Sequence, residues 1–387
     1  MSFDSSSTSR RSVLSDSLKL VGGAGLVLGT VGLSSSRLGA VASAQSATPM
    51  ASPVAGAAPD PQMQEVLDAL ASFSNPPIES VAPHVARNLP SFANALKMVE
   101  MQKGVTPPAV TIQGLVIPGP EGDLPCRTYK PTAMADATML PVVVYFHGGG
   151  FVIANLDTYE ASCIAIADMA QCLVVSVGYR QAPEHPFSAA VDDAYAATQY
   201  VMSNAADMGG DPKKVAVLGE SAGGNLASVV CLKARDEDGM MPLHQVLVYP
   251  ITTYAPTGDQ TASIQTYADA KPLNAAMLDW FKGYYLPNAE DAQNAYSSPI
   301  LALDLSGLPP VTMIQAEIDP LQSQGTAYAD ALKAAGTDVT ATIYPGVTHE
   351  FFGMGSVIDT AKKAEQDAAT ALTTAFAAGG MATPVAQ

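Results

Sequence analysis

The sequence has few positive charges. It holds 19 Lys and Arg residues against 36 Asp and Glu residues, and its formal net charge is −17. Proteins that bind nucleic acid need clustered cations to neutralise the phosphates. The composition therefore argues against a nucleic-acid partner, and the acidity is read most simply as a well-solvated surface.

Long apolar runs are also missing. The apolar N-terminal stretch, residues 20–33, is too short and too rich in glycine for a comfortable membrane span. It follows Arg10 and Arg11 and precedes Ala42-Ser43-Ala44, a small-residue cleavage site. This order predicts a twin-arginine-type signal peptide over residues 1–44, and a mature protein in the periplasm or outside the cell without a stable membrane span. An uncleaved N-terminal anchor is the alternative.

Cysteine is scarce, and the chain lacks the signatures of bound cofactors. Its four cysteines have no metal-site spacing to a histidine or to one another. Their even number permits disulfides in an exported protein, whereas folding before export would leave buried thiols, and the sequence favours neither. No metal, nucleotide or flavin motif is present, so we expect no cofactor. The cysteines are Cys126, Cys163, Cys172 and Cys231.

The two ends of the chain differ in composition from its middle. Residues 45–61 are rich in Ala, Pro and Ser and are predicted to form a flexible leader, and residues 377–387 a loose tail. The stretch between them, residues 62–376, has no internal repeat. It is predicted to fold as one domain.

Strands and helices alternate within this domain. The strands are apolar throughout, which is typical of a parallel sheet covered by helices on both faces. The sequence therefore predicts an α/β fold with a mainly parallel, eight-stranded sheet. Strands are expected at 110–117, 124–129, 141–146, 173–179, 214–218, 245–249, 311–315 and 339–344, and helices at 158–169, 189–206, 221–235, 325–335 and 357–376.

Two further helical segments stand outside this alternation, at about 62–103 and 272–287. We expect them to form a helical cap that walls a pocket. Trp280, the only tryptophan, is the preferred pocket residue of the second segment, and Phe151 is a second candidate. Ordinary packing is the interpretation of the other aromatic residues in that segment.

Two glycine-rich motifs, each after an apolar β-branched run, carry the chemistry. They are His-Gly-Gly-Gly-Phe at 147–151 and Gly-Glu-Ser-Ala-Gly-Gly at 219–224. Glycines flank a serine on a sharp strand-to-helix turn because a Cβ would collide with neighbouring backbone. Such a turn presents the Ser221 hydroxyl at the end of the sheet, and the first motif offers backbone N–H groups to a developing oxyanion. Together they predict an acyl-transfer site.

A serine nucleophile needs a base, and the base needs a carboxylate that orients it. Only His244 and His349 follow Ser221 in the chain. His244 begins an apolar run and suits a strand edge, whereas His349 lies in a loop after the last strand, where we expect it to be mobile and exposed. Asp319 directly follows a strand, and the proline after it keeps it in a loop. Glu317 is the alternative acid.

With these motifs the sequence resembles the bacterial hormone-sensitive lipase family of α/β-hydrolases over residues 62–376. The resemblance rests on the motifs at 147–150 and 219–224, on Asp319-Pro320-Leu321, on His349, and on Tyr-Arg-Gln-Ala-Pro-Glu-His-Pro-Phe at 179–187. It implies the α/β-hydrolase fold, with Ser221 as nucleophile, His349 as base and Asp319 as orienting carboxylate. It also implies three oxyanion donors, the backbone N–H groups of Gly149, Gly150 and Ala222.

Three residues depart from the family pattern. Glu220 stands where Asp or Thr is more usual, Gln181 replaces a leucine, and Glu350 occupies a position where a small residue is common. The two glutamates bear on the pH optimum and on substrate preference. Structural roles are expected for His147, Glu184 and His185.

The resemblance implies a carboxylic ester hydrolase that acts on short- to medium-chain acyl esters through an acyl-enzyme. Its partner would be a small-molecule ester. An amide or peptide hydrolase on the same triad is one alternative. A non-catalytic ligand receptor is another, against which the presence of His349 argues. The sequence leaves the natural ester, the stereochemical preference and the oligomeric state open.

Overall fold

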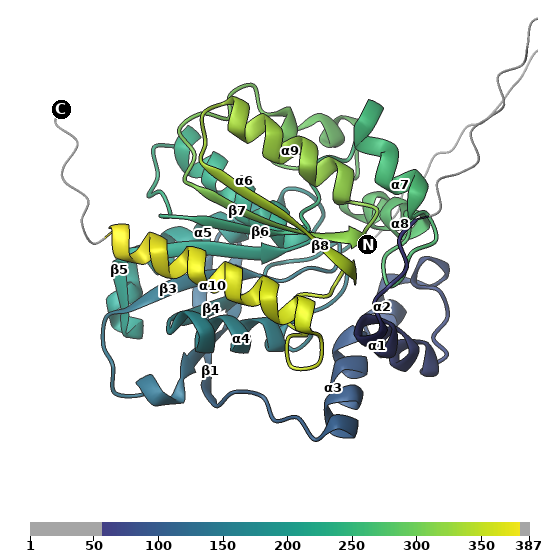
Figure 1. The fold of residues 1–387 in the computed structure, drawn as a ribbon. Helices are drawn as coiled ribbons and strands as arrows, with labels where there is room; N and C mark the ends of the chain where they lie inside the picture. The colour runs from purple at the N-terminus through teal and green to yellow at the C-terminus, as the bar shows by residue number, and fades with distance from the viewer. Residues whose placement is uncertain (1–55, 380–387) are drawn as a thin grey trace, which may run out of the picture. The chain divides into compact units, whose positions relative to one another are not determined.

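The computed structural model describes residues 56–379, so the predicted signal peptide and most of the predicted leader and tail lie outside the described residues. Its strands are β1 (Val110–Gly119), β2 (Gly122–Pro131), β3 (Leu140–Phe146), β4 (Leu173–Val177), β5 (Gly210–Glu220), β6 (Gln245–Val248), β7 (Val311–Ile318) and β8 (Val339–Thr348). They form one eight-stranded sheet in the order β1-β2-β4-β3-β5-β6-β7-β8 (Figure 1).

The sheet is mainly parallel. β2 pairs antiparallel with both β1 and β4, and every neighbouring pair from β4 to β8 is parallel. This confirms the predicted architecture. The carboxyl ends of β5, β6, β7 and β8 consequently meet at one edge of the sheet, which is where loops of parallel α/β folds gather functional side chains.

The main helices in the described chain are α1 (Pro61–Ser72), α2 (Pro83–Ala86), α3 (Phe92–Lys103), α4 (Glu160–Ala170), α5 (Ala189–Asn204), α6 (Ala222–Asp236), α7 (Ala262–Thr266), α8 (Ala275–Tyr285), α9 (Gln322–Ala334) and α10 (Asp359–Gly379). In Figure 1, α6 and α9 lie above the sheet, and α4 and α10 lie below it. No helix within residues 56–379 has the length and apolarity needed to cross a membrane.

Side chains of the central strand β3 enter two separate cores. Val142 and Val144 belong to a core that also contains residues of α5, α6 and α9, whereas Val143 and Tyr145 belong to a core that contains residues of α4 and α10. Successive side chains of a strand point to opposite faces, so a strand covered on both faces must be apolar at every position. This is the physical reason for the unbroken apolar runs in the sequence.

The folded part extends slightly beyond the predicted domain boundaries. Asp60 caps α1, since its Oδ1 accepts a hydrogen bond from the Met63 N–H at 2.7 Å. The Asp60 N–H donates to the Gly346 carbonyl at 2.8 Å, which ties the start of α1 to the end of β8. At the other end, α10 continues to Gly379, three residues past the predicted limit at 376.

Candidate active site

The turn between β5 and α6 holds Ser221 in an unusual backbone conformation. Its φ is 56° and its ψ is −115°, outside the regions that side chains normally allow. A Cβ on Gly219 would lie 2.0 Å from the Gly223 carbonyl oxygen, and one on Gly223 would lie 1.9 Å from the Phe146 carbonyl oxygen. Both glycines are therefore required sterically, as the sequence pattern indicated.

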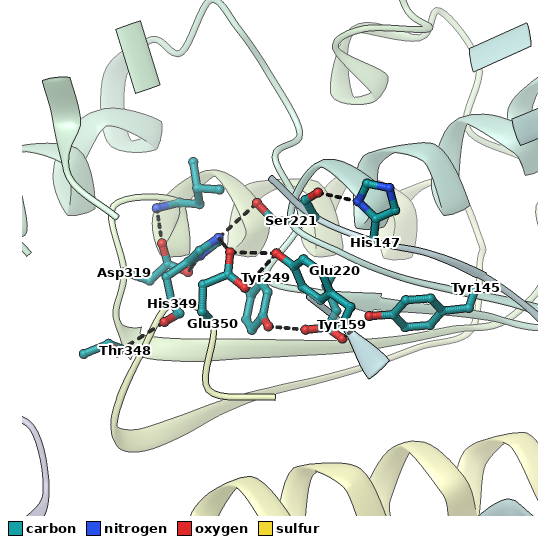
Figure 2. Close-up of polar contacts among 12 residues, drawn as sticks. Tyr145, His147, Tyr159, Glu220, Ser221, Tyr249, Asp319, Thr348, His349 and Glu350 are labelled. Atoms are coloured by element: carbon teal, nitrogen blue, oxygen red, sulfur yellow. Dashed lines mark hydrogen bonds and ion pairs between the residues drawn. The ribbon is translucent and has the colours of Figure 1, made fainter. Parts of the chain in front are cut away.

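Three distant side chains meet at this turn (Figure 2). The Ser221 Oγ lies 2.9 Å from His349 Nε2, and His349 Nδ1 lies 2.7 Å from Asp319 Oδ2. The carboxylate only accepts, so Nδ1 carries the ring proton and Nε2 is free to accept from the serine hydroxyl. The Leu321 N–H donates to Asp319 Oδ1 at 2.8 Å and fixes the carboxylate.

Each of the three residues directly follows the last residue of a strand. Ser221 follows β5, Asp319 follows β7 and His349 follows β8. These strands are parallel and lie within the run β5-β6-β7-β8, so their ends lie at the same sheet edge. The sheet order thus brings together residues that lie up to 128 positions apart in the chain.

His349 is buried, with 2% of its surface exposed, so the expectation of an exposed base was wrong. The Tyr249 ring packs against the imidazole, with ring centroids 4.4 Å apart. Burial by itself lowers the pKa of His349, but the charge and hydrogen bond of Asp319 raise it, as do the charges of Glu350 and Glu220. The net result is a pKa above the ordinary value of 6.5.

The other candidates for base and acid lie elsewhere. His244 Nε2 hydrogen-bonds to Thr312 Oγ1 at 2.9 Å, and burial lowers the His244 pKa to about 4. Glu317 Oε2 accepts a hydrogen bond from the Gly346 N–H at 2.8 Å, so its carboxylate is directed at the neighbouring strand β8. Neither residue hydrogen-bonds to the site of Ser221.

Two of the three residues expected to have structural roles, His147 and Glu184, brace the loops around the site, and the third, His185, is exposed. The His147 ring stacks on Tyr179 with centroids 4.3 Å apart, and burial lowers the His147 pKa to about 4. Glu184 pairs with Arg87 at 2.7 Å, and the Arg87 hydrogen bond lowers the pKa of that carboxyl to about 2. Arg87 also donates to the Val152 carbonyl at 2.7 Å, so the pair holds the chain after the first glycine motif.

Gly149 and Gly150 of the first motif border the same cavity as Ser221. Gly149 has a φ of 98°, and a Cβ there would lie 2.2 Å from the Ile153 carbonyl oxygen. Ala222 is the first residue of α6, where backbone N–H groups have no partner within the helix. The assignment of Gly149, Gly150 and Ala222 as oxyanion donors stays a prediction.

A cavity of about 620 Å³ opens onto Ser221 and His349. Both segments outside the β/α alternation contribute to its wall. Residues 62–103 supply Leu67 and Leu70 of α1 and Phe92 of α3, and the segment around α8 supplies Met277 and Phe281.

The two aromatic residues expected in the pocket lie outside its lining. Phe151 is fully buried and stacks on Tyr285, with ring centroids 3.8 Å apart. Trp280 packs edge-on against Phe281 and Tyr284. The buried face of α8 consists of Met277, Phe281 and Tyr285, which are spaced by four residues and therefore share one side of the helix. That spacing, visible in the sequence, identifies Phe281 rather than Trp280 as the inward residue.

Sequence reasoning missed a cluster of acidic and phenolic groups beside His349. The Tyr159 hydroxyl lies 2.8 Å from both carboxylate oxygens of Glu350 (Figure 2). Glu350 Oε1 lies 3.8 Å from His349 Nε2. Glu220, next in the chain to Ser221, accepts hydrogen bonds from Tyr145 and Tyr249.

Burial controls ionisation in this cluster. It raises the pKa of Glu220 to about 8, although hydrogen bonds from Ser162, Tyr145 and Tyr249 act in the opposite direction. Burial also raises the pKa of Glu350 above 4.5, while His349 and the Tyr159 hydrogen bond lower it. Burial raises the pKa of Tyr159 well above 10, so its hydroxyl keeps its proton and donates to Glu350.

The four cysteines are all buried free thiols. Burial raises the pKa of Cys126 and of Cys172 to about 12, which keeps these thiols protonated and unreactive. In the described part of the chain, no group of three or more His, Cys, Asp or Glu side chains is arranged to hold a metal ion.

Comparison with known proteins places the chain in a family. A family model described as alpha/beta hydrolase fold matches residues 143–353. The chain belongs to the hormone-sensitive lipase-like family of α/β-hydrolases. The predicted family and fold are therefore confirmed.

Curated relatives carry ester-hydrolase names. The carboxylic ester hydrolase LipN of Mycobacterium tuberculosis is 42% identical over 251 residues, which cover 63% of this chain and 65% of the relative. The carboxylesterase NlhH of the same organism is 42% identical over 245 residues, which cover 62% of this chain and 75% of the relative. These relatives support an ester-hydrolase enzyme.

Solved structures agree. The ester-hydrolase EH1AB1 from the metagenome of Lake Arreo, complexed with a derivative of bipyridine phosphonate, superposes with a TM-score of 0.74 at 36% identity and covers 82% of this chain and 99% of its own. An esterase of Pyrobaculum calidifontis gives a TM-score of 0.71 at 36% identity, covering 79% of this chain and 96% of its own.

Proposed function

We propose that the protein hydrolyses carboxylic esters with short to medium acyl chains through an acyl-enzyme on Ser221. The observation that carries the proposal is the hydrogen-bonded series Ser221–His349–Asp319, with contacts of 2.9 and 2.7 Å, beside a cavity that Ser221 and His349 line. A hydroxyl, an imidazole and a carboxylate in this order form the arrangement that activates a serine for attack on a carbonyl.

Acylation follows from the geometry. The Ser221 Oγ attacks the ester carbonyl carbon while its proton passes to His349 Nε2. Asp319 stabilises the imidazolium that forms, and backbone N–H groups of the glycine loop and of Ala222 would bind the oxyanion. The tetrahedral intermediate then collapses, the bond to the alcohol oxygen breaks, and His349 returns the proton to the leaving alcohol.

Deacylation repeats these steps with water in place of the serine. The water oxygen attacks the acyl carbon, its proton passes to His349, and the bond to the Ser221 Oγ breaks as the proton returns to that oxygen. The carboxylic acid leaves and the enzyme is regenerated. In each half-reaction His349 takes up one proton and returns it, and one bond forms for each bond that breaks. The scheme therefore balances with the protein, the ester and water alone.

The cavity supports small acyl groups. Its volume of about 620 Å³ lies within the range of small-molecule sites, and its wall includes Leu67, Leu70, Met277 and Phe281. One methylene changes discrimination by only about 1–3 kcal/mol in such a pocket. We therefore expect a broad preference over neighbouring chain lengths.

The test compares the protein with its Ser221→Ala variant on p-nitrophenyl acetate, butyrate, octanoate and palmitate. We expect turnover of the shorter esters, weak turnover of palmitate and near-complete loss in the variant. A fluorophosphonate should label one peptide, the one that contains Ser221. Equal rates for both proteins would contradict the serine mechanism, and faster cleavage of matched p-nitroanilides would favour the amidase alternative.

We also propose that the protein is exported through a twin-arginine-type signal over residues 1–44. The support is the order of Arg10 and Arg11, the apolar stretch 20–33 and Ala42-Ser43-Ala44. N-terminal sequencing of secreted protein is expected to start at Gln45. An intact Met1 in that material would contradict cleavage, and replacement of both arginines by lysine should stop export.

A further inference from the structure

Glu350 stands on backbone that suits glycine better. Its φ is 71°, in the left-handed region, where a residue with a Cβ is sterically disfavoured. The neighbouring Gly346 and Gly353 adopt similar left-handed φ values of 68° and 85° without this cost. The backbone alone therefore does not account for a glutamate at 350, and its side chain is the part to explain.

The Glu350 side chain is held beside the catalytic imidazole. Its Oε1 lies 3.8 Å from His349 Nε2, the nitrogen that faces the Ser221 Oγ. The Tyr159 hydroxyl lies 2.8 Å from both carboxylate oxygens and fixes their position. The side chain is 12% exposed, and this exposed part borders the cavity that contains Ser221.

The separation of Oε1 and Nε2 is too long for a direct hydrogen bond but suits one bridging water. Two acceptors 3.8 Å apart are each within about 2.8 Å of a common oxygen placed between them on the cavity side. A water there would donate one proton to the imidazole nitrogen and the other to the carboxylate. This orients its lone pairs toward the cavity.

We propose that Glu350 positions the hydrolytic water that attacks the acyl-enzyme, an inference that rests on the proposed esterase function. In the acyl-enzyme the Ser221 Oγ is esterified and no longer donates to Nε2, so that nitrogen is free to accept from water. The water oxygen bonds to the acyl carbon while one water proton passes to Nε2. The other proton stays on the new hydroxyl of the acid, and Glu350 remains a hydrogen-bond acceptor throughout.

This role differs from a general electrostatic effect. The charge of Glu350 near the imidazolium would assist acylation and deacylation alike, because both steps place a proton on His349. Positioning of water acts on deacylation only. The two steps must therefore be measured separately.

The experiment uses two variants. Glu350→Gly removes the carboxylate and relieves the left-handed backbone, which offsets the loss of the Tyr159 hydrogen bond, so the variant should still fold. Glu350→Gln keeps an acceptor oxygen and should retain part of the function. Stopped-flow release of p-nitrophenol from p-nitrophenyl butyrate gives the acylation rate as the initial phase, and mass spectrometry of quenched samples gives the fraction of acylated enzyme.

For Glu350→Gly we expect acylation to stay within about threefold and deacylation to slow by about tenfold or more, with acyl groups accumulating on Ser221. Glu350→Gln should fall between this variant and the parent. Equal slowing of both steps would overturn the proposal in favour of the charge effect, and unchanged deacylation would overturn it outright.

Asp238→Gly is the matched control. Asp238 is an exposed acid with a φ of 52°, two residues beyond α6. That helix has 15 residues, so Asp238 lies about 22 Å from Ser221 along its axis. Its replacement should change neither step. A parent protein that shows no initial phase and no acylation of Ser221 would contradict the proposed function instead, which keeps the two failures distinct.

Discussion

The side chains proposed for catalysis and the wall of the cavity have different structural origins. Ser221, Asp319 and His349 each stand one residue past a strand of the parallel sheet. Much of the wall comes from helices at two distant parts of the chain, α1 to α3 and α8. β5 and β7 are paired on both sides and β8 is paired with β7, so the ends of these strands have little freedom, whereas a helix contacts a cavity through one face only. The chemistry is therefore fixed by sheet order, and the pocket by helix rotation.

The largest expected effect concerns the catalytic side of this comparison. Asp319→Asn should lower kcat by about 10⁴-fold, because an amide N–H directed at Nδ1 forces the other imidazole tautomer and Nε2 no longer accepts from Ser221. Steady-state kinetics on p-nitrophenyl butyrate measures this loss of kcat. Glu317→Gln is the control, since Glu317 contacts the Gly346 N–H instead. A similar loss in that control would mean that the acid is misassigned.

A substitution at Gly150, where the glycine loop contacts Phe281 of α8, should have the next largest effect. A Cβ on Gly150 would lie 2.3 Å from the Phe281 ring. Gly150→Ala should therefore displace the glycine loop and lower kcat by about 10²-fold, in line with loss of an oxyanion donor. Adding Phe281→Ala should recover part of the loss because it removes the obstructing ring.

Gly104→Ala is the control for backbone strain. Gly104 has a φ of 65°, close to the 60° of Gly150, but nothing lies within 4 Å of its Cβ position. It should cost about 1–2 kcal/mol of unfolding free energy and leave kcat unchanged. If Phe281→Ala recovers nothing, strain at Gly150 rather than the contact explains the loss.

The pocket side of the comparison should respond more weakly. Phe281→Ala is expected to raise KM for p-nitrophenyl butyrate by about tenfold, or about 1.4 kcal/mol, because Phe281 lines the cavity. Trp280→Ala, at the adjacent position outside the lining, should leave KM nearly unchanged. A larger rise in KM for Trp280→Ala than for Phe281→Ala would show that α8 presents its other face to the substrate.

The smallest expected effect is a shift in pH dependence. His349 accepts a proton only when neutral, and its pKa is raised because Asp319, Glu350 and Glu220 outweigh the effect of burial. Activity should therefore fall with decreasing pH along a limb that lies above pH 6.5. Glu350→Gln removes one of the charges that raise this pKa, so the limb of kcat/KM should move to lower pH. A shift to higher pH would contradict this account.

Part of the site was readable from the sequence because its constraints are local. A Cβ on Gly219 would lie 2.0 Å from the Gly223 carbonyl oxygen, in the same turn, and one on Gly223 would lie 1.9 Å from the Phe146 carbonyl oxygen at the end of β3. The apolar runs of β3 follow from a sheet covered on both faces. His349 and Asp319 could be named because each follows a strand and few alternatives exist downstream of Ser221.

Other features depend on how distant elements pack. The burial of His349 depends on Tyr249, which follows β6 and lies 100 positions earlier in the chain. The position of the Glu350 carboxylate depends on a hydrogen bond from Tyr159, which lies 191 positions earlier in the chain. Neither contact leaves a periodic or motif signal in the sequence. The four-residue spacing of Met277, Phe281 and Tyr285 is such a signal. It marks the buried face of α8, and Trp280, the residue predicted for the pocket, does not belong to it.

By itself, then, the amino-acid order determined where the Ser221 turn lies, which strands are buried and which residues qualify as partners of the serine. Glycines mark the turn, side chains alternate along each strand, and few His or acidic residues follow a strand downstream of Ser221. Only the tertiary structure decided that His349 is enclosed, that Phe281 faces the substrate cavity and that the Glu350 carboxylate lies beside the reactive nitrogen. Those outcomes depend on the distances between segments that are far apart in the chain. The order of the strands and the packing of the helices against them determine these distances.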